Sequence, residues 1–323
     1  MKLYFAPIDG VTGFIYRNAF ADFFGGPHKY FAPFISPCHN PKLKGKEIRD
    51  LLPENNSEKV TLVPQIMANN AEYFIKGARQ LQEMGYQEVN LNAGCPSGTV
   101  VSKSRGAGFL KDTYEMTKFF DTVFDRLDMK ISVKTRIGLL ESSEFEEIME
   151  VYNQFPFEEV IVHPRTRVQL YKGEPDMEAF DYAYKVSKNE LCYNGNVFTV
   201  KDYEKICHTY DISAVMLGRG LLRTPNLANE ILAENFSHEN SGEAVHSEQN
   251  VSKEKLRAFH DRLYGDFTEE MSSWKHLLNK MIEMWNYLSF MTADQHKCAK
   301  MIRKAQNIYQ YEKAVDEIFE RYM

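Results

Sequence analysis

Cysteine is scarce in this sequence and follows no ligand-like spacing. The chain of 323 residues has five, at positions 38, 95, 192, 207 and 298, and none forms a Cys-x-x-Cys pair. An odd number of cysteines in a chain of this size argues against a disulfide framework. Reduced thiols and no metal site are therefore predicted.

Long apolar runs and an excess of basic residues are missing as well. No stretch approaches the roughly 18 apolar residues of a membrane span, and the first residues, MKLYFAPIDG, lack the pattern of a signal peptide. The 39 Lys and Arg residues stand against 45 Asp and Glu, for a net charge of −6. The sequence predicts a cytoplasmic protein without a membrane partner, in which any polyanion meets a local patch.

The sequence does contain a regular alternation of short apolar runs and longer amphipathic segments, up to about residue 235. The segments 69–84 and 113–127 show the spacing of helices with one apolar face. The candidate strands are residues 3–7, 29–35, 60–66, 88–92, 130–136, 159–165, 191–197 and 214–220. Eight strand-then-helix units predict an α/β fold, a TIM (β/α)8 barrel over residues 1–235.

The remainder of the chain is expected to be helical. Residues 236–251 are polar and indicate a linker, and residues 252–323 show helical spacing without a strand signal, which predicts a small all-α domain. Residues 275–304 include six basic and only two acidic residues, together with Trp285 and Tyr287. Such a face can hold a phosphate backbone, although a solvated helix face explains it equally well. The candidate contacts are Lys275, Lys297 and Arg303.

Polar side chains end seven of the eight predicted strands. One such residue alone is more often a cap, but active sites of these barrels lie where strands end, so the set predicts a site. Gln65 and Asn92 carry amides suited to the edge of a heterocycle. The full set is Asp9, Gln65, Asn92 with Cys95, Lys134 with Arg136, His163 with Arg165, Asn194 with Asn196, and Arg219.

Cys95 is the candidate acid. An ordinary thiol has a pKa of about 8.5 and is protonated at pH 7, so it can donate a proton. Its turn, between Gly94 and Pro96, allows close approach to a ligand and stiffens the backbone. The alternative is a small buried apolar residue, the role assigned to Cys192 and Cys207.

Three further segments carry candidate binding residues. The glycine- and serine-rich segment 97–109 is expected to form a loop without regular structure, of the kind that often serves as a lid, whose Lys103 and Arg105 meet a substrate phosphate. The turns 194–196 and 218–220 are suited to a phosphate group. Lys134 is compatible with a Schiff-base nucleophile or with a fixed cation that stabilises an anion, and we favour the cation.

The chain resembles the tRNA-dihydrouridine synthases. The resemblance runs in order through APIDGVTG (6–13), PQIM (64–67), NLNAGCPSGTVVSKSRGAGFL (90–110), VKTRIG (133–138), VHPRTRVQLYKG (162–173), YNGNV (193–197) and VMLGRGLLRTP (215–225). It implies FMN in the barrel mouth, NADPH or NADH as the reductant, and tRNA as the substrate, with no obligate protein partner. A uridine would be turned out of the RNA and reduced at its C5–C6 double bond.

The resemblance also implies roles for single residues. Cys95 would protonate C5 after hydride reaches C6. The residues implied around FMN are Pro7, Ile8, Asp9, Gln65, Lys134, His163, Asn194, Gly195, Asn196, Gly218 and Arg219. The residues expected to serve the RNA or the flavin environment are Asn92, Lys103, Arg105, Arg136 and Arg165. Two rivals remain: a dihydroorotate dehydrogenase-like barrel that acts on a free pyrimidine, and an RNA-binding barrel without catalysis.

Overall fold

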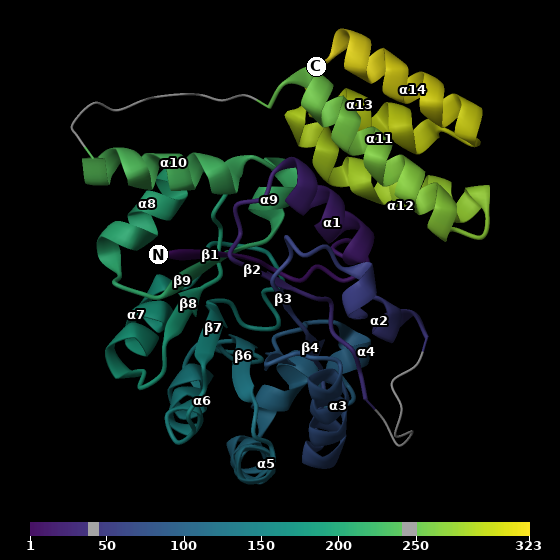
Figure 1. Cartoon of the computed structure of the whole chain (residues 1–323). Coiled ribbons are helices and arrows are strands. Elements are labelled where there is room, and N and C mark those ends of the chain that lie inside the picture. Colours follow the sequence, from purple (N-terminus) through teal and green to yellow (C-terminus); the bar gives the residue numbers. More distant parts are fainter. Residues whose placement is uncertain (38–44, 241–250) are drawn as a thin grey trace.

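The computed structural model describes residues 1–37, 45–240 and 251–323, in which helices surround one parallel sheet (Figure 1). The strands are β1 (Lys2–Phe5), β2 (Lys29–Phe31), β3 (Leu62–Val63), β4 (Gln65–Ile66), β5 (Glu88–Ala93), β6 (Lys130–Arg136), β7 (Glu159–His163), β8 (Leu191–Tyr193) and β9 (Ala214–Leu217). The helices of the barrel region are α1 (Phe14–Phe23), α2 (Lys46–Arg49), α3 (Ala71–Glu83), α4 (Gly98–Val101), α5 (Thr113–Arg126), α6 (Glu144–Tyr152), α7 (Met177–Val186), α8 (Val200–Thr209), α9 (Arg219–Arg223) and α10 (Leu227–Asn240). Short 3₁₀ helices are η1 (Pro53–Asn55) and η2 (Gly106–Lys111).

The sheet closes on itself through one interrupted strand. Its order is β3-β2-β1-β9-β8-β7-β6-β5-β4, and the recorded strand pairs are all parallel. β3 pairs with β2, β4 pairs with β5, and only Pro64 separates β3 from β4. Proline has no N–H to donate, so the ladder breaks there while the chain stays extended. The predicted strand 60–66 is thus divided, and the (β/α)8 barrel is confirmed.

Side chains alternate between the inside of the barrel and the layer of helices. On β6, Ile131 and Val133 pack in the core beneath the helices, so Ser132, Lys134 and Arg136 point inward. The apolar interior is a separate cluster made of Tyr4, Ala6, Phe31, Val63, Ile161, Cys192, Ala214 and Met216. Because all strands run the same way, their inward polar residues gather at one end of the barrel.

One carboxyl group lies deep inside the barrel. Glu159 is 3% exposed, and its Oε1 accepts hydrogen bonds from Tyr4 Oη (3.1 Å) and Ser213 Oγ (3.0 Å). Its Oε2 has no hydrogen-bond partner among the described residues. Burial raises the pKa of Glu159 to about 7, so the folded chain holds this proton at pH values where the unfolded chain has released it.

Glu159→Gln is therefore expected to change the pH dependence of stability. The wild-type free energy of unfolding falls as pH rises from about 4.5 to about 7, because the unfolded chain releases this proton while the folded chain keeps it. The amide cannot ionise, so the variant should gain about 2 kcal/mol relative to wild type between pH 5 and pH 8. Urea denaturation at both pH values measures this. Glu158→Gln, at the surface beside Lys130, is the control, and equal pH slopes for wild type and Glu159→Gln would contradict the assignment.

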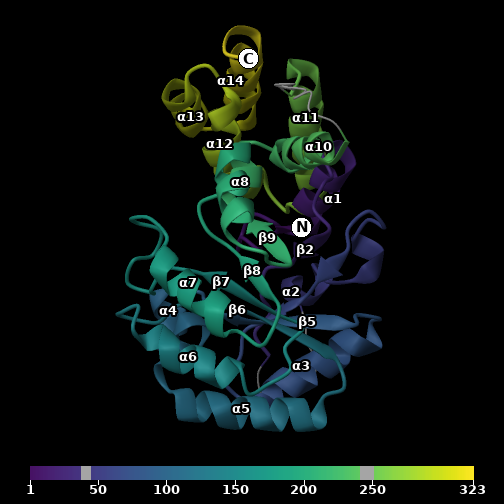
Figure 2. The same cartoon turned by 90° about the vertical axis from the view of Figure 1, so that its left-hand side faces the viewer.

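The C-terminal helices form a group at one end of the molecule, opposite α5 (Figure 2). They are α11 (Lys253–Glu270), α12 (Trp274–Leu288), α13 (Gln295–Lys304) and α14 (Ile308–Arg321), with the 3₁₀ helix η3 (Ser289–Met291). Ser252, Ser273, Asp294 and Asn307 cap their N-termini. Phe259 of α11 packs against Tyr16 and Phe24 at 5.8 and 5.0 Å between ring centroids, which joins the group to α1.

The boundary between the two parts differs in detail from the prediction. Helix α10 extends to Asn240, five residues into the predicted linker 236–251, and residues 241–250 lie outside the described part of the chain. The division into domains stays a prediction. In the residues that the structure describes, no helix is both long and apolar enough to cross a membrane.

Candidate active site

The turn that carries Cys95 is held by hydrogen bonds to its backbone. Asn92 Oδ1 accepts from the N–H groups of Gly94 (3.1 Å) and Cys95 (2.9 Å). The Cys95 carbonyl accepts from the N–H of Ala107 (3.0 Å). Asn92 is the last inward residue of β5, so the strand itself fixes the start of the turn. The thiol is partly exposed.

Two arginines hold the remaining carbonyls of this turn. Arg136 Nε donates to Gly94 O (2.9 Å), and Arg167 Nε donates to Pro96 O (3.2 Å). Arg136 is 1% exposed and also donates through Nη1 to Thr166 O (2.8 Å). Arg167 was missed in the sequence, although it follows Arg165 in the same motif. Both sides of Cys95 are therefore fixed by cations from elsewhere in the barrel, Arg136 on β6 and Arg167 in the loop after β7.

The surroundings of Cys95 favour the protonated thiol. Burial is the main cause that raises the pKa of Cys95, and the Asp9 carboxylate adds to it. Arg136 and Lys134 act in the opposite direction but do not reverse the shift. A thiol with a raised pKa keeps its proton at neutral pH, as a proton donor requires.

A chain of amides supports Asn92 inside the barrel. Asn92 Nδ2 donates to Gln65 Oε1 (2.7 Å), Gln65 Nε2 donates to Asn90 Oδ1 (2.7 Å), and Asn90 Nδ2 donates to Ser132 Oγ (3.0 Å). Gln65 is fully buried, so it orients Asn92 in this structure. Asn90 was not a candidate, because it lies two residues before the strand end; the period-two spacing with Asn92 is the signal that identifies it.

Strand register brings the basic residues together. Lys134 lies opposite Asn92, and Arg136 lies opposite His163. Arg165 Nη1 lies 3.0 Å from His163 Nε2, and because a guanidinium only donates, this nitrogen is the acceptor. Burial and the nearby cations lower the pKa of His163 well below its usual range, so the ring is neutral.

The charged side chains of this cluster have no carboxylate within salt-bridge distance in the described part of the chain. Among the described residues, none of Lys134, Arg136, Arg165 and Arg219 forms a salt bridge, although the protein has a net charge of −6. The buried Nε of Arg165 has no hydrogen-bond partner in this part of the chain. Buried cations without counter-ions are costly unless an anion joins them. The cluster is therefore suited to an anionic ligand.

The two glycine turns border the cluster. Asn196 Oδ1 accepts from Arg165 Nη2 (3.1 Å) and Arg219 Nη2 (3.3 Å), and Asn194 Nδ2 donates to Met216 O (2.8 Å). A Cβ at Gly195 would lie 2.0 Å from the Tyr193 hydroxyl, so this position admits only glycine without rearrangement. Gly218 precedes helix α9. Both turns lie at the same end of the barrel as Cys95.

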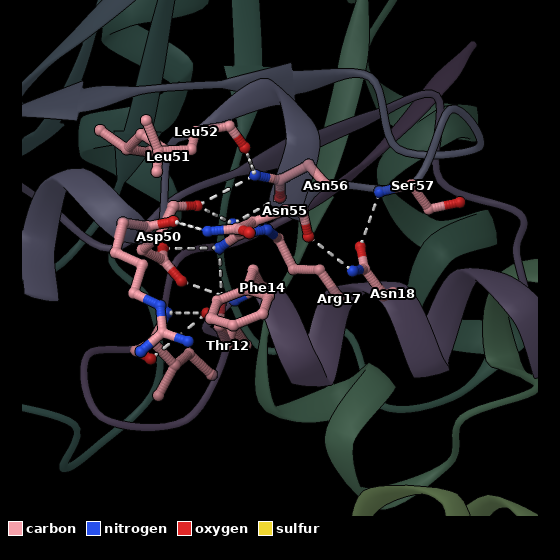
Figure 3. A network of polar contacts seen from close by, with 12 residues as sticks. Thr12, Phe14, Arg17, Asn18, Asp50, Leu51, Leu52, Asn55, Asn56 and Ser57 are labelled. Atoms are coloured by element: carbon pink, nitrogen blue, oxygen red, sulfur yellow. Dashed lines mark hydrogen bonds and ion pairs between the residues drawn. The ribbon is translucent and has the colours of Figure 1, made fainter. Parts of the chain in front are cut away.

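The loop after β1 is anchored from behind (Figure 3). The Ile8 N–H donates to Thr12 Oγ1 (2.8 Å), and Arg17 Nη1 donates to Thr12 O (2.8 Å). Arg17 is buried and paired with Asp50 (3.0 Å). A Cβ at Gly218 would lie 3.9 Å from Ile8 Cδ1, so the predicted segment Pro7–Asp9 reaches the glycine turn of β9. Asp9 itself is exposed.

The segment 97–109 differs from the expected loop. It folds into α4 and η2, and Gly106–Leu110 are buried. A Cβ at Gly106, where φ is +54°, would lie 2.7 Å from Cys95 O, so glycine allows the segment to pack on the turn that carries Cys95. The sequence indicated flexibility where these glycines serve packing. Lys103 and Arg105 lie in this segment. Asn69 Nδ2 donates to Lys103 O (3.1 Å), and Arg105 Nε donates to Asn69 Oδ1 (3.3 Å).

The basic residues predicted in the C-terminal helices lie outside the cluster. Lys275 is near the Trp274 ring, Lys297 is over Tyr322, and Arg303 Nε bonds to Ala299 O. Their contact with RNA stays a prediction. Lys280 of α12, one of the six basic residues of the predicted face, instead donates to Gly10 O in the loop after β1, a contact that the sequence did not predict.

A cavity of about 420 Å³ lies between the barrel mouth and the C-terminal helices. Asp9, whose carboxylate adds to the raised pKa of Cys95, lines this cavity. Phe267 of α11 and Lys280 of α12 line it as well. Other lining residues include Val11, Phe14, Pro33, Phe34 and Met271. This volume is within the usual range of ligand sites.

Comparison with solved structures shows that the barrel is shared with proteins of very different sequence. The chain resembles morphinone reductase (10% identity, TM-score 0.52, covering 72% of this chain and 86% of that one). It also resembles 2-naphthoyl-CoA reductase, with 13% identity and a TM-score of 0.55 over 72% of this chain and 50% of that one.

Sequence comparison identifies closer relatives. A probable tRNA-dihydrouridine synthase of Staphylococcus aureus (strain COL) is 26% identical over 229 residues, 68% of each chain. Another from Helicobacter pylori (strain ATCC 700392 / 26695) is 33% identical over 139 residues, 42% of each chain. The family model described as dihydrouridine synthase (Dus) matches residues 5–319. With nearly its whole length matched, barrel and C-terminal helices included, this chain belongs to the dihydrouridine synthase family.

Proposed function

We propose that this protein reduces the C5–C6 double bond of uridines in tRNA to give dihydrouridine, with FMN as its cofactor and NADPH or NADH as the reductant. The observation that carries the proposal is the Cys95 thiol, whose pKa is raised by burial and whose turn is held beside a cationic cluster that forms no salt bridge among the described residues. Family membership and the names of the relatives support the same reaction. The enzyme is accordingly an oxidoreductase of the CH–CH class.

The residues at the mouth fit an anionic flavin nucleotide. Arg165 and Arg219 converge on Asn196 beside the two glycine turns, and the buried Nε of Arg165 has no protein partner in the described part of the chain. We assign them the phosphate. Lys134 and the neutral His163 would lie along the ring, with the loop Pro7–Asp9 beside it. The remaining residues assigned to FMN are Gln65, Asn194, Gly195 and Gly218.

In this mechanism the protein positions the uracil and moves one proton. When bound, the reduced flavin supplies a hydride to C6 of the uracil. Cys95 Sγ then gives its proton to C5, and the turn held by Asn92, Arg136 and Arg167 keeps the sulfur in place. The extruded base costs a few kcal/mol of stacking and pairing energy. The cavity bordered by Asp9 lies next to this site and is suited to admit the base from the side of the C-terminal helices.

Dihydrouridine mapping tests the proposal directly. Purified protein with FMN and NADPH should convert uridine in a tRNA transcript to a nucleoside two hydrogens heavier, detected by mass spectrometry after digestion. Free uracil and dihydroorotate, given in parallel, test for a barrel enzyme that acts on free pyrimidines. Turnover of those bases without dihydrouridine in RNA would refute the proposal.

The charge of Lys134 should make flavin affinity depend on pH. Burial, with Arg136 nearby, lowers the pKa of Lys134 to about 8, so in the free protein the positive charge is present below that pH and lost above it. We expect FMN binding, followed by flavin fluorescence, to weaken roughly tenfold between pH 7 and pH 9.5. Lys134→Gln should bind weakly at both pH values. Lys134→Arg should bind with no such pH dependence, and the wild-type fall persisting in that variant would contradict the assignment.

A further inference from the structure

Arginines and aromatic rings alternate across the rim of the barrel. The Tyr171 ring lies near two guanidinium groups, with its centroid 5.4 Å from Arg136 Cζ and 5.0 Å from Arg219 Cζ. The centroid of the Phe198 ring lies 5.5 Å from the same Arg219 Cζ. These contacts join the loop after β7, helix α9 and the loop after β8.

The alternation continues to the C-terminal helices. Arg223, one turn after Arg219 on α9, lies 4.8 Å from the ring of Phe198 and 4.1 Å from that of Phe290 in η3. We call the six residues the arginine–aromatic row. They are Arg136, Tyr171, Arg219, Phe198, Arg223 and Phe290.

The row carries positive charge that the described protein leaves unpaired. Arg223, like Arg136 and Arg219, forms no salt bridge among the described residues. The buried Nε of Arg223 has no hydrogen-bond partner in the same part of the chain. Three guanidinium groups held close together without a carboxylate repel one another and attract an anion.

Two of the rings are open to solvent. Tyr171 is 55% exposed and Phe290 is 38% exposed. Leu170, next to Tyr171, has a φ of +53°, a conformation that is unfavourable for a residue with a branched side chain. The loop thus holds an exposed ring over the mouth despite local strain. A ligand with both phosphates and flat rings matches such a surface, and single-stranded nucleic acid has both.

The row also has a direction. It begins at Arg136, which holds the backbone beside Cys95, and it ends on η3, beyond the residues assigned to FMN. We propose that the row binds the nucleotides that flank the extruded uridine, with a phosphate on Arg223 and bases against Tyr171 and Phe290, while Arg219 stays with the FMN phosphate. This inference rests on the proposed function, because it assumes that RNA reaches Cys95.

Substitution of Arg223 tests the row by RNA affinity. Arg223→Leu keeps apolar bulk near Phe198 and Phe290, and Arg257→Leu removes a partly exposed arginine of α11 that pairs with Asp261 and Asp316. Fluorescence anisotropy with a labelled tRNA transcript is measured over a range of salt concentrations. We expect Arg223→Leu to bind about 5- to 30-fold more weakly, with a salt slope smaller by about 0.7 to 0.9. Arg257→Leu should match the wild type. If Arg223→Leu also had the wild-type RNA affinity and salt slope, the proposal that the row binds RNA would be wrong.

Photocrosslinking separates this inference from the proposed function. p-Benzoylphenylalanine introduced at position 290 should crosslink to the transcript within a few nucleotides of the dihydrouridine, whereas the same group at position 309, an exposed tyrosine of α14, should not. Dihydrouridine formed by the wild type without crosslinks from position 290 would refute the row alone. A wild type that forms no dihydrouridine would refute the proposed function.

Discussion

Replacing Cys95 with alanine is expected to reduce dihydrouridine formation by about 10²- to 10⁴-fold, the usual contribution of a positioned general acid. In the proposed mechanism the thiol is the proton donor, a role that its raised pKa suits, and its removal leaves the cationic cluster in place. FMN content and the rate at which NADPH reduces the flavin should stay at wild-type values. Anaerobic reduction of the flavin, followed by mixing with tRNA, measures the two half-reactions separately.

Two other variants define what the loss means. Cys207→Ser changes a partly buried thiol far along the chain, beside Met1, and should leave both half-reactions unchanged. Arg167→Ala removes the hydrogen bond to Pro96 O but keeps the thiol, so we expect a smaller loss, confined to the RNA half-reaction. Wild-type product formation by Cys95→Ala would exclude Cys95 as the acid.

The strand-end residues were predictable because one physical rule places them. In a parallel barrel, every second side chain points inward and all strands end at the same rim, so Asn92, Lys134, His163 and Asn194 could be grouped from spacing alone. The sequence could not show that Gln65 is fully buried, because both amide partners lie on β5 and are set by strand register.

Residues outside the strands were harder to predict. Arg167 and Lys280 act on backbone carbonyls that are distant in sequence, and no local pattern marks such partners. The glycines at 106 and 108 gave a misleading signal: a Cβ at Gly108 would lie 2.6 Å from Val101 O, so close packing requires this glycine. A glycine in a loop indicates either conformational freedom or close packing against another segment, and only the folded structure shows which of the two applies.

The buried ion pair between Arg17 and Asp50 was not predicted by any sequence motif. Arg17 is 1% exposed, and its guanidinium donates to Thr12 O (2.8 Å), Asp50 Oδ2 (3.0 Å) and Asn56 Oδ1 (2.8 Å) (Figure 3). Asp50 Oδ1 also accepts from the N–H of Phe14 (2.6 Å). The pair therefore links the first turn of α1 to the loop that reaches the barrel mouth.

Asp50→Ala is expected to lower the free energy of unfolding by about 3 kcal/mol, because it leaves a buried guanidinium without its counter-charge. Asp22→Ala, which breaks exposed pairs with Lys59 and Arg262, should cost less than about 1 kcal/mol. Urea denaturation of both variants gives the comparison. Equal losses in the two variants would show that burial adds nothing to the Arg17 pair.

The same substitution should weaken FMN binding, because Arg17 holds Thr12 O and the Thr12 hydroxyl holds the Ile8 N–H. The double variant Arg17→Met with Asp50→Leu removes both charges and should recover much of the lost stability. It should not recover FMN affinity, since no donor then reaches Thr12 O. Recovery of stability and affinity together would mean that the loop keeps its shape without Arg17, and that the pair serves folding alone.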